Sequence, residues 1–318
     1  MIIKCPDASL SRNERIEALI QSMSDWIYSD DFMGLMTLFH SDIKITGTIQ
    51  DDIVKIHDFV RVWDYRQGRE RWAVEDESFV LNNSEYIMNR MKGLGLVGHE
   101  NPTDEADYIL PLGGARMANH TRPEQSKRII EKLGWKNKKI IALSGLRPIS
   151  DAENSFVEQY TRPADTEFDA ISIGMENAFG LSSYSEERID DDNPNLVSIV
   201  RKYDDKFEGC ECFSLAAPSS EPEKRRANSY DTFKYLLEQF KVPEKARILL
   251  VTSCIYVPFQ FLKFMDLAID NSFSVDCVGS DSVGHFSLSK PSNYLQEVKG
   301  TVDAIYSLVV KFCPPDIK

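Results

Sequence analysis

Long apolar runs are missing from this chain, and so is an excess of positive charge. No segment approaches the roughly 20 consecutive apolar residues that span a bilayer. The first residues, Met-Ile-Ile-Lys-Cys-Pro-Asp, lack the cationic start and apolar core of a signal peptide. Acidic residues outnumber basic ones by 50 to 37, which gives a net charge of -13. We therefore expect a cytoplasmic protein that contacts no membrane and no nucleic acid, because polyanion binding needs clustered Lys and Arg.

The common catalytic and cofactor motifs are also missing. No Gly-x-Gly-x-x-Gly follows a predicted strand, and no Gly-x-x-x-x-Gly-Lys-Ser/Thr phosphate loop occurs. The Gly-x-Ser-x-Gly nucleophile turn is absent as well. The 5 histidines are scattered, and of the 6 cysteines only Cys210 and Cys212 are close in sequence. Because a metal site of this kind needs a second ligand pair, the sequence predicts no metal.

What is present is an ordinary globular composition. With 318 residues, 42% hydrophobic and 27% charged, the chain has enough apolar residues for one large domain or two smaller ones. Apolar residues recur at helical spacing over 11–39, 51–65 and 84–96, and glycines at 93, 95 and 98 then break the pattern. We expect residues 1–103 to form a helical domain or a lid.

From residue 104 the pattern changes to strands alternating with helices. Short, nearly continuous apolar runs, typical of buried parallel strands, occupy 108–112, 139–144, 211–216, 247–253 and 274–278. Amphipathic segments lie at 123–133, 166–179, 229–240, 258–269 and 293–312. This alternation predicts an α/β domain over 104–318 with a doubly wound, mainly parallel, Rossmann-like sheet. The acidic stretch 182–208 does not fit the alternation, and we expect an excursion or a flexible loop there.

Small residues, hydroxyls and cations follow one predicted strand after another. They are Gly113, Gly114 and Arg116; Ser144 and Gly145; Arg226, Asn228 and Ser229; and Thr252, Ser253 and Tyr256. Glycines allow a close backbone approach, and Arg116 carries a guanidinium suited to a phosphate or a carboxylate. Each feature also has an ordinary structural role, as a turn or a helix cap. Their recurrence at one sheet edge favours a site for a phosphorylated or nucleoside-type ligand.

Two residues near these loops are candidate acids or bases. His120 follows the first loop, and Glu167 opens a predicted helix. A separate aromatic and basic cluster is a candidate partner surface or simply part of the packed helical domain. Its members are Trp63, Arg66, Arg69, Arg71 and Trp72.

The order of the strand-end elements resembles the YdcF/SanA/ElyC-like family over about residues 104–280. The matching positions are Gly113, Gly114 and Arg116; Ser144 and Gly145; Glu167; Arg226, Asn228 and Ser229; and Val251, Thr252 and Ser253. Tyr256 and Phe259 stand where the family often has His and Arg, which puts chemistry based on that histidine in doubt. The resemblance implies the soluble YdcF-type branch, with S-adenosylmethionine as the ligand and no settled reaction.

The sequence leaves three functions open. The first is a binding protein for a nucleoside-type or phosphorylated ligand, S-adenosylmethionine being the one that the resemblance implies. The second is a hydrolase or transferase for a phosphorylated or sugar-nucleotide substrate, with Glu167 or His120 as the general base. The third is a non-catalytic, ligand-gated interaction module, suggested by Trp63 and Trp72.

Overall fold

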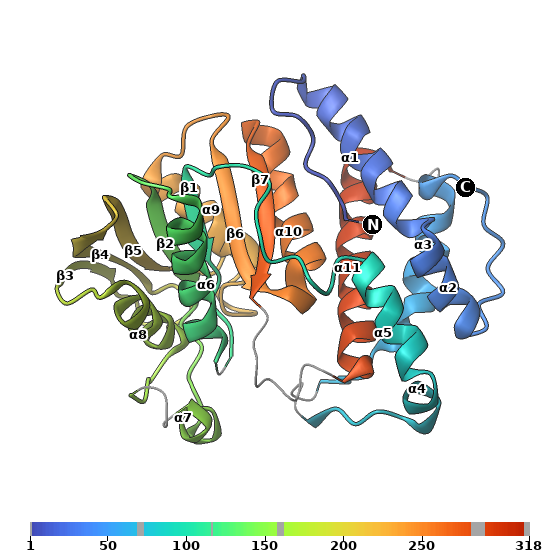
Figure 1. Cartoon of the computed structure of the whole chain (residues 1–318), viewed down its shortest axis with the longest axis horizontal. Coiled ribbons are helices and arrows are strands. Elements are labelled where there is room, and N and C mark those ends of the chain that lie inside the picture. The colour runs from blue at the N-terminus through green and yellow to red at the C-terminus, as the bar shows by residue number, and fades with distance from the viewer. Residues whose placement is uncertain (1, 69–72, 116, 158–161, 281–289, 315–318) are drawn as a thin grey trace. The chain divides into compact units, whose positions relative to one another are not determined.

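The chain folds into two compact units, which are described separately (Figure 1). The computed structural model describes residues 2–68, 73–115, 117–157, 162–280 and 290–314. The helical unit comprises Met1–His99, Cys254–Asp270 and Val283–Lys318. The α/β unit comprises Glu100–Ser253 and Asn271–Ser282. The helical unit therefore combines the first third of the chain with segments from its C-terminal end.

The helical unit is built around buried aromatic side chains. Its helices are α1 (Arg12–Ile27), α2 (Asp30–Leu38), α3 (Ile49–Phe59), η1 (Val60–Trp63), α4 (Ser78–Asn82), α5 (Ser84–Gly93), η3 (Cys254–Tyr256), α10 (Val257–Asn271) and α11 (Pro291–Phe312). Trp26, Phe32 and Trp63 are fully buried, and the ring of Phe32 lies 5.2 Å from that of Trp26 and 6.1 Å from that of Trp63. None of the helices in the described part of the chain is long and apolar enough to cross a membrane.

The apolar pattern over 11–39 forms two helices rather than one continuous helix. Ser29 separates them, because its side chain donates to the carbonyl of Trp26 at 2.7 Å and accepts from the backbone N–H of Phe32. Asp30 and Asp31 follow in the first turn of α2, where negative charge is favourable. The sequence Ser-Asp-Asp is thus a helix start that the hydrophobic spacing alone does not reveal.

The α/β unit contains one seven-stranded sheet with the order β3-β4-β5-β2-β1-β6-β7. The strands are β1 (Tyr108–Pro111), β2 (Lys139–Ser144), β3 (Tyr184–Ile189), β4 (Ser198–Phe207), β5 (Cys210–Ala216), β6 (Arg247–Ser253) and β7 (Ser274–Ser280). All neighbouring pairs from β5 to β7 are parallel, whereas β3 and β4 pair antiparallel. The prediction of an α/β fold with a mainly parallel sheet is therefore confirmed.

Helices cover both faces of this sheet. The helices of this unit are α6 (Ala118–Leu133), α7 (Asp151–Val157), α8 (Glu167–Phe179) and α9 (Ser229–Phe240), and of these α6, α8 and α9 pack on the sheet. The helices α6 and α8 lie on the near face in Figure 1, where Ile130 and Ile171 belong to one apolar cluster with Cys212 of β5. Phe213, the next residue of β5, points to the opposite face and packs against Phe240 of α9, with ring centroids 4.9 Å apart.

The expectation of a loop over 182–208 is wrong, because β3 and β4 form an antiparallel hairpin there. Every residue of β3 is exposed, so this strand buries no alternating apolar face. Charged residues such as Glu186 and Glu187 stand at positions where a half-buried strand would have apolar residues. A strand is recognised in a sequence by alternating apolar residues, and Tyr184–Ile189 has no such alternation.

Candidate functional site

The turn between β1 and α6 is held by its own side chains. Asn119 bonds Gly114 in both directions: its Oδ1 accepts from the Gly114 N–H at 2.9 Å, and its Nδ2 donates to the Gly114 carbonyl at 2.6 Å. The Gly113 N–H donates to the carbonyl of Leu143 at 2.6 Å, which ties the turn to the end of β2. The predicted glycine loop is therefore a rigid turn at the carboxyl edge of the sheet.

Arg122 crosses the same edge beneath this turn. Its Nη1 donates to the carbonyls of Leu112 at 2.6 Å and Gly113 at 2.5 Å, and its Nη2 donates to Ser253 Oγ at 3.3 Å. Only 3% of the residue is exposed. The guanidinium thus joins the end of β1 to the end of β6 and brings a positive charge to the point where the two strands finish.

Glu167, at the start of α8, lies directly against the first loop. A Cβ placed on Gly113 would sit 2.6 Å from Glu167 Oε1 and 2.9 Å from Ser144 Cβ, so only glycine fits there. Burial raises the pKa of the Glu167 carboxyl, and the charges of Arg147, Arg122 and Arg226 oppose that rise. A partly buried carboxyl that is paired with Arg147 and also feels the charges of Arg122 and Arg226 is therefore the chemical centre of this edge.

Arg147 holds Glu167 in place from the loop after β2. Its Nε donates to Glu167 Oε2 at 3.1 Å, while Nη1 and Nη2 form a fork onto Glu153 at 2.8 and 2.9 Å. Glu153 is 3% exposed, and the ion pair raises the pKa of Arg147. The Glu167 N–H also donates to the Arg147 carbonyl at 2.8 Å. This clamp fixes where the carboxyl of Glu167 points.

The loop before α9 closes the same edge. A Cβ on Gly145 would lie 4.0 Å from the Ala227 carbonyl, which brings the second and third predicted loops together. Asn228, rather than Ser229, caps α9: its side chain accepts from the Asp231 N–H at 3.1 Å, and the Asp231 carboxylate accepts from the Asn228 N–H. Of the two candidates Asn228 and Ser229, it is thus Asn228 whose side chain has the ordinary role of a helix cap. Arg226 is exposed and available to an incoming anion.

The remaining predicted residues differ in their surroundings. Ser144, Thr252 and Ser253 are buried at the ends of their strands. His120 is 8% exposed, and burial lowers the pKa of its imidazole. Tyr256 lies in η3 of the helical unit, outside the unit that holds the other candidates. Arg116 lies outside the described residues.

The aromatic and basic cluster offers no partner surface at Trp63. This side chain is fully buried, with the rings of Phe39 and Phe59 5.6 and 5.9 Å away. Arg69, Arg71 and Trp72 lie outside the described residues. Trp63 is thus part of the core of the helical unit, and it no longer supports the interaction-module hypothesis.

Arg122 is the site residue that the sequence argument missed, and Arg147 was recognised only as part of the loop after the second predicted strand. The expected helical segment 123–133 leaves Arg122 out, whereas α6 begins at Ala118 and has Pro123 inside it. Arg147 directly follows the Ser-Gly-Leu turn, and its position after a strand was the available signal. The contacts that matter, with Ser253 and Glu153, cannot be read from spacing.

Comparison with known proteins shows that the chain is similar in sequence to a group of mycobacterial proteins. Residues 11–95 match a family described as the Rv3785 N-terminal domain. The chain is similar to uncharacterized protein Rv3785 of Mycobacterium tuberculosis and uncharacterized protein Mb3814 of Mycobacterium bovis. Each is 26% identical over 337 residues, covering 96% of this chain and 93% of the relative. No solved structure gives a significant match.

These matches correct the proposed resemblance to the YdcF/SanA/ElyC-like family. The similarity to Rv3785-type proteins runs through nearly the whole chain, including the helical first third. Glycines, hydroxyls and helix caps after strands recur in any open parallel sheet, so their order along the chain does not identify one family. The expectation of S-adenosylmethionine came from that resemblance and loses its basis with it.

Proposed function

We propose that the α/β unit binds a phosphorylated small molecule at the carboxyl ends of β1, β2, β5 and β6. The observation that carries this proposal is the charge around Glu167. The guanidinium groups of Arg122, Arg147 and Arg226 all favour the charged form of this one partly buried carboxyl. Glu153 engages Arg147 in addition, so positive charge exceeds negative charge here in a chain of net charge -13. A local excess of this kind favours an anion.

The strand order supports the same location. Along the chain the parallel strands run β1, β2, β5, β6, β7, and in the sheet they lie in the order β5-β2-β1-β6-β7. This is the 3-2-1-4-5 order of a Rossmann-like, doubly wound sheet, and we propose that fold class for the unit. The order reverses between β1 and β6, where Arg122 bridges Gly113 and Ser253. Ligands of such sheets bind beside this point.

Arg226 is the group best suited to test ligand binding, because it is exposed and its loss leaves no buried charge unpaired. Titration calorimetry would compare inorganic phosphate, pyrophosphate, ATP, a UDP-sugar and S-adenosylmethionine. A charged hydrogen bond contributes about 1.5–3 kcal/mol, so Arg226→Ala should weaken phosphate-ligand binding by about tenfold or more. Arg188→Ala on the exposed strand β3 changes net charge equally and should leave affinity unchanged. Equal affinity in both variants would place the anion elsewhere.

A second candidate function is a hydrolase or transferase for a phosphorylated substrate. The observation that favours it is the raised pKa of Glu167, because a carboxyl moved toward neutral pH can act as a general acid or base. Glu167→Gln should then abolish turnover across a phosphoester panel while phosphate binding persists. If the unmodified protein binds phosphate ligands but turns none of them over, the enzyme hypothesis is wrong and only the binding function remains.

A further inference from the structure

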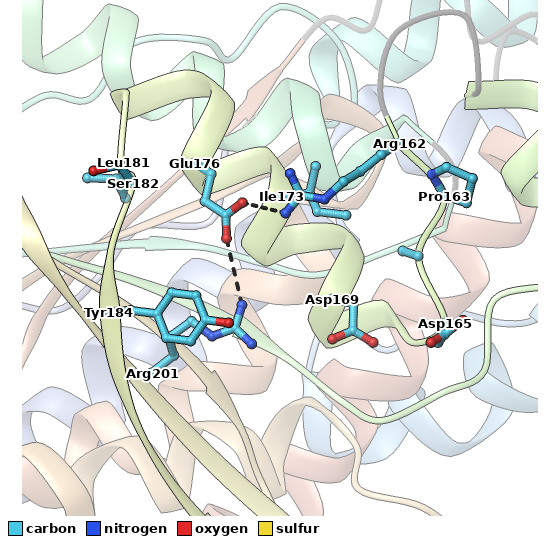
Figure 2. Close-up of a pocket in the computed structure, with 11 residues that line it drawn as sticks. Arg162, Pro163, Asp165, Asp169, Ile173, Glu176, Leu181, Ser182, Tyr184 and Arg201 are labelled. Atoms are coloured by element: carbon cyan, nitrogen blue, oxygen red, sulfur yellow. Dashed lines mark hydrogen bonds and ion pairs between the residues drawn. The ribbon is translucent and has the colours of Figure 1, made fainter.

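A cavity lies beside α8, and it is lined by other residues than those of the proposed anion site. It measures about 570 Å³ and is lined by α8, the β3–β4 hairpin and the segment after residue 161 (Figure 2). That volume falls in the range of about 300–1,000 Å³ that small-molecule pockets occupy. No residue of the anion site lines this cavity.

The lining carries three carboxylates, two guanidinium groups and a few apolar side chains. Asp169 and Glu176 stand on one face of α8 with Ile173 between them. Seven residues of helix separate the two carboxylates by about 10 Å along the axis. Asp165 adds a third carboxylate beside Asp169, and Leu181 adds a second apolar wall. This pattern fits a chain of methylene groups with a positive charge at each end.

The guanidinium of Arg201 does not reverse this charge balance. It lies 4.0 Å from the ring centroid of Tyr184 and 5.0 Å from that of Phe168. Its Nη1 lies 3.7 Å from Glu176 Oε1, and its Nη2 pairs with Glu186 at 2.8 Å. Arg201 is therefore shared between two carboxylates, and it forms a fixed wall of the cavity.

Arg162 already occupies the Glu176 end as a cation supplied by the chain itself. Its Nη2 lies 2.6 Å from Glu176 Oε2, yet 62% of its side chain is exposed. Figure 2 shows Arg162 and Arg201 reaching Glu176 from different sides. An exposed side chain held by one ion pair is weakly retained, so another cation can take its place.

We propose that this cavity binds a linear aliphatic diamine or polyamine, with one ammonium on Glu176 in place of Arg162 and another between Asp165 and Asp169. The methylene chain lies along Ile173 and Leu181. Arg162 competes with the ligand for Glu176. The proposal is independent of the anion site, because the two share no residue.

Titration calorimetry of the full chain with putrescine, spermidine and a series of longer terminal diamines tests this. Diamines that span two helical turns should bind more tightly than putrescine, and methylamine more weakly than either. Glu176→Gln and Asp165→Asn should each weaken spermidine binding by about tenfold, since each removes a charged hydrogen bond. Arg162→Ala should strengthen it, because the competing cation is gone. Asp165 is exposed, so its variant tests the proposal even if Glu176→Gln disturbs folding.

Glu187→Gln is the matched control, because it removes the same charge from an exposed position of β3 outside the cavity. Its spermidine affinity should equal that of the unmodified protein. Equal weakening in Glu187→Gln and Glu176→Gln would show general attraction to an acidic protein and overturn the proposal. Weaker binding by Arg162→Ala, or no dependence on diamine length, would overturn it as well.

Discussion

Gly174 of α8 should be one of the positions least tolerant of a methyl group. A Cβ there would lie 1.8 Å from the carbonyl oxygen of Asn119 in α6 and 3.3 Å from the Cα of His120. Pro123 has no N–H to donate to that carbonyl, so α8 approaches it closely at a residue without a side chain. Since real Cβ contacts stay beyond about 3.0 Å, Gly174→Ala forces the two helices apart by about 1.2 Å.

Two opposing effects decide whether Gly174→Ala raises or lowers the free energy of unfolding. Alanine gains about 1 kcal/mol over glycine inside a helix. Overpacking costs about 1–3 kcal/mol, and the contact here is with backbone, which cannot rotate away. The cost therefore lies at the upper end of that range, about 3 kcal/mol, and we expect Gly174→Ala to lower the free energy of unfolding by about 2 kcal/mol in urea titrations followed by circular dichroism. The movement also reaches Asn119, which holds the Gly114 turn, so phosphate affinity should fall too.

Gly300 in the interior of α11 is the matched control. A Cβ there would meet Phe259 at 3.6 Å, an ordinary contact. Gly300→Ala should therefore stabilise the protein by up to about 1 kcal/mol. If Gly174→Ala is as stable as the unmodified protein, the close approach of α6 and α8 is not as described.

Three further outcomes follow from the strand-end edge. Asn228→Ala should cost about 1 kcal/mol of stability in urea unfolding because it removes the cap of α9, whereas Ser229→Ala should be nearly neutral. Arg147→Ala should cost about 3–5 kcal/mol by the same measurement, because it leaves the carboxylate of Glu153 buried without its partner. The raised pKa of Glu167 means that the folded state binds this proton more tightly, so stability falls as pH rises from about 4.3 through the raised value. Unfolding measured across this window should show a flatter profile for Glu167→Gln, and identical profiles would contradict the burial argument.

The buried strands and the central helices were predictable from sequence. The bounds of β2 and β6 match the predicted runs 139–144 and 247–253, and α9 matches 229–240. Strands covered on both faces read as continuous apolar runs, and an amphipathic helix repeats its apolar residues every three or four positions. These signals are local, so a single sequence suffices.

The parts that sequence reasoning missed depend on contacts rather than periodicity. In α6, Pro123 looked like a first-turn residue, but the helix starts at Ala118, and its residue Asn119 lies against Gly174 of α8. Arg122 reaches Ser253 across 131 positions of chain, a distance over which no spacing rule operates. The direction of the strands alone predicts that several loops meet at one edge of the sheet. It does not predict which side chains contact one another there.

The helical unit has a consequence for how the protein is made. Its segments include the first 99 residues and Val283–Lys318, and α11 packs against α3, η1 and α5. The ribosome synthesises the start of the chain long before α11. The apolar faces of the early helices that α11 covers therefore stay exposed while the α/β unit is being synthesised. A fragment limited to residues 11–95, the part that matches the Rv3785 N-terminal domain, would lack α11 altogether. Synthesis from the N-terminus thus completes the first unit last.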